Sequence, residues 1–213
     1  MRLFACGDIH GDTDLASKLA KKAKDANVDV IVLTGDITSH TQEFENLIGP
    51  FKKLNKKIFI INGNHDDLET TEFISKKYGL YHLNKKSYVV DDVTLFGCGG
   101  SNVGLARMSE DELFDYIKKS HDSVFNLDSK INNNADNKKA KTKIMITHNH
   151  PSKTMMANLS NIVKGSDGVL SAIYELKPEF LLCSHVHEGK GIEEMIGKTK
   201  VINVSKIGKV LDL

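Results

Sequence analysis

The stretch "RLFACGDIHGD" at residues 2–12 joins a short apolar run to a cluster of polar side chains, and this junction decides the fold. Residues 2–6 have the composition of a buried β-strand. A glycine follows them, and then Asp8, His10 and Asp12. Such residues are common in a turn that starts a helix. They also place carboxylate and imidazole groups at the end of a strand.

Four further apolar runs end in the same way. They are "VDVIVLT" at 28–34, "KKIFIIN" at 56–62, "KTKIMIT" at 141–147 and "PEFLLCS" at 178–184, and they are followed by "GDIT", "GNHDD", "HNHP" and "HVHEG". Helix-like stretches lie between several of these runs, for example at 13–27 and 41–55. This alternation predicts an α/β fold with largely parallel central strands.

Two further stretches predict antiparallel hairpins, so the sheets should be mixed. Residues 88–98 turn at Asp91 and Asp92, and residues 193–204 turn at Gly197 and Lys198. An amphipathic helix is expected from Ser109, which forms a capping box with Glu112.

The segment 99–141 is expected to be a lid or rim insertion within one domain that spans 1–213. It either places Ser101, Asn102 or Arg107 over the site or packs a plain helix on the rim, and both alternatives stay open. Its last part belongs to an Asn- and Lys-rich stretch, 126–143, which we expect to be an exposed loop.

Composition narrows the class of protein. The chain has 213 residues, 40% of them hydrophobic, and a formal net charge of +1, so it indicates no polyanionic partner. No apolar segment reaches the length of a signal peptide or a membrane span, and we expect a cytoplasmic protein without membrane contact. Cys6, Cys98 and Cys183 lie in or beside apolar runs without a CxxC pair, and we expect reduced, packed thiols.

The histidines are concentrated at the predicted strand ends. Of nine histidines, six lie in the five short polar stretches: His10, His65, His148, His150, His185 and His187. Each stretch alone is compatible with a turn or a helix cap. In open α/β sheets, however, sites form beyond the carboxyl ends of the strands. Together the stretches therefore predict a metal site.

The ordered set "GDIHG", "GD", "GNHD", "THNHP" and "SHVHEG" spans Asp8 to Glu188 and resembles the calcineurin-like metallophosphoesterase family. It looks most like the small archaeal and bacterial phosphoesterases that are loosely related to class III cyclic-nucleotide phosphodiesterases. The resemblance implies an α/β sandwich of two mixed β-sheets flanked by helices, with a dinuclear metal site.

The resemblance also implies a role for each motif residue. Asp8, His10 and His187 would hold one metal, Asn64, His148 and His185 the other, and Asp36 would bridge them. His65 would lie outside the metals, near the scissile phosphate. His148 is preferred to His150 as a ligand because it directly follows its strand. We expect His150, Asp66 and Ser39 to contact the substrate or the ligands.

The implied activity is hydrolysis of phosphodiesters, phosphomonoesters or both, by in-line attack of a metal-bridging hydroxide. The ligand types fit Mn, Fe, Zn or Ni, with Mn favoured, and two such ions suit phosphate ester chemistry. A phosphodiesterase is expected rather than a phosphoprotein phosphatase, because "GDITSHT" has Ser39 where those phosphatases have an acid, and no arginine follows. The substrate would be a small phosphate ester, including a small nucleotide. The alternative is a non-catalytic scaffold that binds a protein on the same fold.

Overall fold

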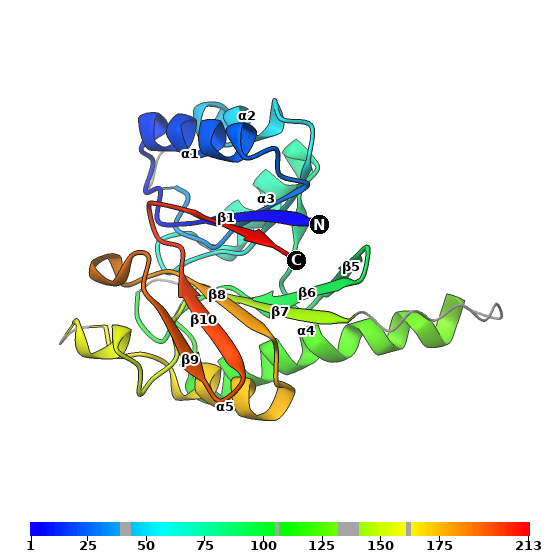
Figure 1. Ribbon diagram of the computed structural model, residues 1–213, viewed down its shortest axis with the longest axis vertical. Helices are drawn as coiled ribbons and strands as arrows, with labels where there is room; N and C mark the ends of the chain where they lie inside the picture. Colours follow the sequence, from blue (N-terminus) through cyan, green and yellow to red (C-terminus); the bar gives the residue numbers. More distant parts are fainter. Residues whose placement is uncertain (39–43, 105–106, 132–140, 161–162) are drawn as a thin grey trace.

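The computed structural model describes residues 1–38, 44–104, 107–131, 141–160 and 163–213, and it contains two mixed β-sheets that pack against each other (Figure 1). The five-stranded sheet has the order β11-β1-β2-β3-β4. Its strands are β1 (Arg2–Cys6), β2 (Val30–Leu33), β3 (Lys57–Ile60), β4 (Tyr81–His82) and β11 (Lys209–Asp212). Strands β1 to β4 are parallel, and β11 pairs antiparallel with β1.

The six-stranded sheet has the order β5-β6-β7-β8-β10-β9. Its strands are β5 (Tyr88–Val90), β6 (Val93–Cys98), β7 (Thr142–Thr147), β8 (Phe180–Cys183), β9 (Glu193–Ile196) and β10 (Thr199–Asn203). The four central strands are parallel, and the predicted hairpins supply antiparallel strands β5 and β9 at the two edges.

Helices cover the outer face of each sheet (Figure 1). Helices α1 (Thr13–Asp25), α2 (Phe44–Lys52) and α3 (Leu68–Tyr78) lie on the five-stranded sheet, and α4 (Glu110–Ile131) and α5 (Asp167–Leu176) lie on the six-stranded sheet. Two short 3₁₀ turns lie at Met156–Asn158 and His187–Gly189. The fold is thus the predicted α/β sandwich of two mixed sheets.

Strand β1 shows why these strands are continuous apolar runs in the sequence. Leu3 and Ala5 pack into the core between the two sheets, whereas Phe4 and Cys6 pack against the helices. A strand that is buried on both faces has no polar alternation. Strand β1 therefore separates two apolar layers, one between the sheets and one beneath the helices.

The three cysteines are buried free thiols, as predicted. Burial raises the pKa of Cys98 to about 12, which keeps this thiol protonated and unreactive near neutral pH. Among the described ranges, no helix has the length and apolar character that a membrane span requires.

The predicted start of the loop at 126–143 was wrong. Helix α4 continues to Ile131, whereas we expected a loop from residue 126 onwards. The stretch 126–131 contains neither proline nor glycine, so no residue in it breaks a helix that has already started. The rest of that predicted loop lies partly at 132–140, outside the described residues.

Candidate metal centre

The carboxyl ends of five parallel strands bring the predicted motif residues to one place between the sheets. Asp8 and His10 follow β1, Asp36 follows β2, Asn64 and His65 follow β3, His148 follows β7, and His185 and His187 follow β8. Three groups of these side chains have candidate ligand atoms within 4.8 Å of one another: Asp8, His10 and His187; His10, Asp36 and His65; and Asp36, His148 and His185.

The backbone at this place is held in an uncommon conformation. Asp8, His10, Asp36 and His185 all have positive φ values, between 50° and 75°. Residues other than glycine rarely adopt this region, and each such residue costs about 1 to 3 kcal/mol unless the surroundings enforce it. Strained residues of this kind cluster at functional sites.

Hydrogen bonds between neighbouring loops enforce this conformation. The amide of Asp8 donates to the carbonyl of Gly35 at 3.0 Å, and the amide of His10 donates to the carbonyl of Asp36 at 2.8 Å. The amide of His185 donates to Oδ2 of Asp8 at 3.0 Å. The loop after β1 is therefore fixed by the loops that follow β2 and β8, which gives its side chains defined positions.

The first group is formed by Asp8, His10 and His187. Nε2 of His10 lies 3.1 Å from Nε2 of His187, and Oδ1 of Asp8 lies 3.7 Å from the same His187 nitrogen. Asp8 is fully buried, and its Oδ1 has no hydrogen-bond partner in the described part of the chain. A buried carboxylate oxygen without a partner is costly, so a cation between these atoms would stabilise the group.

The second group is formed by Asn64, His148 and His185. Nδ1 of His148 lies 2.9 Å from the carbonyl oxygen of Thr34 and donates to it. Nε2 of His148 lies 2.9 Å from Oδ1 of Asn64 and 3.1 Å from Nδ1 of His185. The carbonyl of Thr34 thus fixes the His148 ring so that Nε2 faces the two other candidate ligand atoms.

Asp36 lies between the two groups. Its Oδ2 is 3.7 Å from Nε2 of His10 and 3.3 Å from Nε2 of His148. Its Oδ1 accepts a hydrogen bond of 2.8 Å from the amide of His65, which leaves Oδ2 directed to both histidine groups.

The protonation states suit cation binding. Burial alone would raise the pKa values of Asp8 and Asp36, but neighbouring histidines lower both below the usual range. Burial would lower the pKa of His148, but the charges of Asp36 and Asp8 raise it to about 9. Burial and the charge of His148 lower the pKa of His185 to about 3. Two ionised carboxylates therefore attract positive charge, and His185 is neutral, as a metal ligand must be. His148 carries a proton near neutral pH, and a metal ion bound to its Nε2 would displace that proton.

These residues fit divalent metal ions. Carboxylate, imidazole and amide atoms converge from five loops, and one buried oxygen among them lacks a partner. A donor set of oxygen and nitrogen without thiolate is typical of Mn, Fe, Zn and Ni.

His65 lies at the open side of this centre. It is exposed, and its ring centroid is 5.1 Å from that of His10 in an edge-on arrangement. One of its ring nitrogens lies within 4.8 Å of ligand atoms of His10 and Asp36. A substrate at the centre can therefore reach its imidazole.

Of the residues expected to contact substrate or ligands, Asp66 and His150 are both buried. Asp66 accepts hydrogen bonds from the amides of Ile37 and Thr38 at 3.0 and 2.9 Å, so it holds the loop that carries Asp36. His150 is fully buried, its ring centroid lies 6.4 Å from that of His185, and neither of its ring nitrogens has a hydrogen-bond partner in the described part of the chain. Ser39 lies outside the described residues.

Asp12 and Asp67, two further acids beside the motifs, cap helices. The side chain of Asp12 accepts from the amide of Leu15 at the start of α1, and that of Asp67 accepts from the amide of Thr70 at the start of α3. Neither carboxylate belongs to the groups of candidate ligands.

Sequence reasoning missed Asn149 and the hydrogen-bond chain to which it belongs. Oγ of Ser101 lies 3.4 Å from Nε2 of His185 and donates to Oδ1 of Asn149 at 2.6 Å. Asn149 donates in turn to Oδ1 of Asn102 at 3.0 Å. The segment that begins at residue 99 therefore contacts the centre through Ser101, and its helix α4 packs against β6 and α5 on the outer face of the sheet.

Comparisons with known proteins agree with this arrangement. The model of the calcineurin-like phosphoesterase family matches residues 1–189, and the chain belongs to this family. A comparison with curated proteins gave no significant match.

Several solved structures share the fold. Protein TT1561 of Thermus thermophilus superimposes with a TM-score of 0.69 at 16% identity, covering 95% of this chain and 88% of that one. A novel archaeal phosphodiesterase gives a TM-score of 0.53 at 17% identity, covering 95% and 82%. A dimetal phosphatase from Danio rerio gives 0.55 at 12% identity, covering 95% and 86%.

Proposed function

We propose that this protein is a phosphoesterase that uses two divalent metal ions, Mn favoured, and that it hydrolyses phosphodiesters in preference to phosphomonoesters. The observation that carries the proposal is the position of Asp36, whose Oδ2 faces His10 at 3.7 Å and His148 at 3.3 Å. One carboxylate oxygen between two groups of ligand-type atoms suits a bridging ligand.

In this proposal each group holds one ion. Asp8, His10 and His187 hold the first ion, Asn64, His148 and His185 hold the second, and Asp36 contacts both. When bound, two such ions polarise the phosphoryl oxygens and lower the pKa of a water molecule that attacks in line. The ionised carboxylates of Asp8 and Asp36 keep the ions in place.

His65 has a different part in the proposal. Its ring is exposed beside the first group, at the side that a substrate would approach. An imidazole at this position holds a phosphoryl oxygen by a hydrogen bond or protonates the departing alkoxide. His65 therefore acts on the substrate and not as a metal ligand.

The scarcity of arginine near the centre favours diesters. The chain has two arginines, and Arg2 donates to Asp212 at 2.6 Å and to the carbonyl of Ala26 at 2.9 Å. A phosphomonoester carries more negative charge than a diester and is commonly held by several cationic side chains. A diester, with its single charge, needs fewer of them.

The proposal is tested with a chromogenic phosphodiester and the corresponding monoester, using Mn-loaded protein and Asp36→Asn as the control. We expect faster turnover of the diester, lost in the control. Faster turnover of the monoester would overturn the diester preference alone. No turnover of either ester with Mn, Fe, Zn or Ni would overturn the enzyme and favour the protein-binding scaffold.

A further inference from the structure

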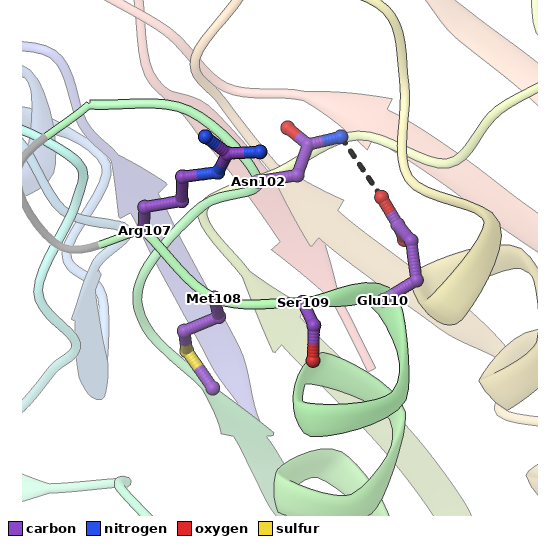
Figure 2. A pocket seen from close by; sticks show the side chains of 5 residues that line it. All are labelled: Asn102, Arg107, Met108, Ser109 and Glu110. Carbon is purple, nitrogen blue, oxygen red and sulfur yellow. Dashed lines mark hydrogen bonds between the residues drawn. The ribbon is translucent and has the colours of Figure 1, made fainter.

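A cavity of about 550 Å³ opens where the link between β6 and α4 meets the first turn of α4. Figure 2 shows the side chains that line it: Asn102, Arg107, Met108, Ser109 and Glu110. Its volume is in the range of small-molecule sites in proteins.

Buried hydrogen bonds attach this cavity to the candidate metal centre. Asn102, in its wall, accepts a hydrogen bond from Asn149, and Asn149 accepts one from Ser101, whose hydroxyl lies 3.4 Å from Nε2 of His185. Ser101 and Asn149 are almost completely buried. A wall of the cavity is thus only two side chains away from a candidate ligand.

Most polar groups of the lining already have partners. Asn102 donates to Oε1 of Glu110 at 3.0 Å (Figure 2). The second oxygen of Glu110 accepts from the hydroxyl of Ser166 and from the amide of Gly168, at the start of α5. Ser109 donates to Glu112 within the capping box. The carboxylate of Glu110 is therefore held between Asn102 in the cavity wall and the N-terminus of α5, and these donors stabilise its negative charge.

Arg107 differs from these residues because its side chain makes no hydrogen bond or ion pair with the described part of the chain. The side chain is exposed, and in Figure 2 it extends over the cavity toward Asn102. The backbone beside it is fixed, since the amide of Met108 donates to the carbonyl of Ser101 at 2.7 Å. A guanidinium offers five donors in a plane that matches a carboxylate or a phosphate.

We infer that this cavity binds a second anionic group of the substrate, a phosphate or a carboxylate, while the metal centre binds the scissile phosphate, and that Arg107 recognises this second group. The inference rests on the proposed function. The inference restricts the substrate to phosphate esters that have a second anionic group. This group would lie on the part of the substrate that enters the cavity, called its arm below. Met108 gives that arm an apolar wall.

The scissile phosphate does not need Arg107. Two ions and His65 already surround the position of the reacting group in the proposed function, and Asn102 with Asn149 stands between His185 and the cavity. Arg107 lies beyond the side chains of Asn102 and Asn149 as seen from His185, so its guanidinium suits an anionic group of the substrate that does not react. Arg107 is therefore a specificity residue.

The test uses two chromogenic phosphodiesters that release the same nitrophenolate. The second ester arm of one ends in a carboxylate, and that of the other ends in the methyl ester of this carboxylate. The ratio of kcat/KM, acid arm over methyl ester arm, is measured for the Mn-loaded wild type, Arg107→Met and Arg107→Lys. Lys24→Ala, which removes a charge from the exposed face of α1, is the control.

We expect the wild type to prefer the acid arm by about tenfold or more, since hydrogen bonds between charged groups are strong. Arg107→Met should abolish the preference, Arg107→Lys should keep a part of it, and Lys24→Ala should retain it. A wild-type ratio near one, or an equal loss on both substrates in Arg107→Met, would overturn the inference while the phosphoesterase stands. No turnover of either substrate by the wild type would overturn the proposed function itself, and the inference with it.

Discussion

Nε2 of His10 lies 3.1 Å from Nε2 of His187, and the two rings stand nearly edge to face. Oδ1 of Asp8, which has no hydrogen-bond partner in the described chain, is 3.7 Å from the same His187 nitrogen. Three electron-pair donors that approach one another in this way are stabilised by a cation between them.

Metal binding should therefore raise the unfolding temperature. A ligand at a hundred times its Kd stabilises a folded protein by about 2.7 kcal/mol. We expect the unfolding temperature in Mn to exceed that in a chelator, and to increase with Mn concentration. Calorimetry with both samples measures this difference. Identical unfolding curves in Mn and in the chelator would show that the folded protein binds no Mn.

His187→Ala should remove one ion and leave the other. His187 belongs only to the first group, and its side chain is 38% exposed, so its loss should disturb the fold little. We expect the metal content per chain, measured by elemental analysis, to fall by about half. Loss of all metal would show that the two groups do not bind independently.

Asp36→Asn should instead reduce the metal content at both positions. Its Oδ2 faces both histidine groups, and an amide does not supply the negative charge of a carboxylate. We expect lower metal content than in His187→Ala, together with loss of turnover. Wild-type metal content and rate would exclude Asp36 as the shared ligand.

His65→Ala should lower the rate without removing metal. The side chain is exposed beside the first group, and a positioned acid or electrostatic group contributes roughly 10²-fold or more to the rate. Elemental analysis and kcat, measured on the same preparation, separate the two roles. Because His65 lies within reach of His10 and Asp36, loss of an ion would instead identify it as a ligand.

Ser101→Ala should weaken metal binding although Ser101 is not a candidate ligand. Its hydroxyl contacts Nε2 of His185, and loss of a residue that orients a ligand commonly costs at least about tenfold in metal affinity. Ser123→Ala is the control, because Ser123 donates to the carbonyl of Ser120 and accepts from the amide of Ser87. Equal Kd values for Mn in both variants would exclude the positioning role.

Local signals explain why much of the architecture could be predicted from the sequence. Ser109 and Glu112 form the expected capping box at the start of α4. The strand ends were predictable for the same reason, since each apolar run stops at a polar motif. Such signals lie within a few residues of the element that they define.

The supporting contacts of the site could not be predicted in this way. Ser101 and His185 are 84 residues apart in the sequence, and Asn149 and Asn102 are 47 apart. A serine or an asparagine in a loop has many local roles, and its partner is determined only when distant strands pack. The groups that orient candidate ligands therefore require the structure, whereas the candidates themselves follow from motifs at strand ends.

Gly63→Ala should disrupt the centre by steric contact alone. A Cβ atom at Gly63 would lie 1.9 Å from Oδ1 of Asp36 and 2.5 Å from its backbone nitrogen, so the loop that carries Asp36 would have to move. The φ of Gly63 is not positive, and alanine therefore brings no backbone strain of its own at this position. We expect loss of most bound metal and a lower unfolding temperature.

Gly49→Ala is the matched control for this substitution. Gly49 lies inside α2, where a Cβ would meet the flexible carboxylate of Glu45, at 3.2 Å, outside its chain neighbours and the helix backbone. Alanine inside a helix is favoured over glycine by about 1 kcal/mol, but a Cβ directly before Pro50 opposes this gain, so this variant should have a stability near that of the wild type and retain its metal. If Gly63→Ala also retained its metal, the packing of Gly63 against Asp36 would not be needed to position the carboxylate between the two histidine groups.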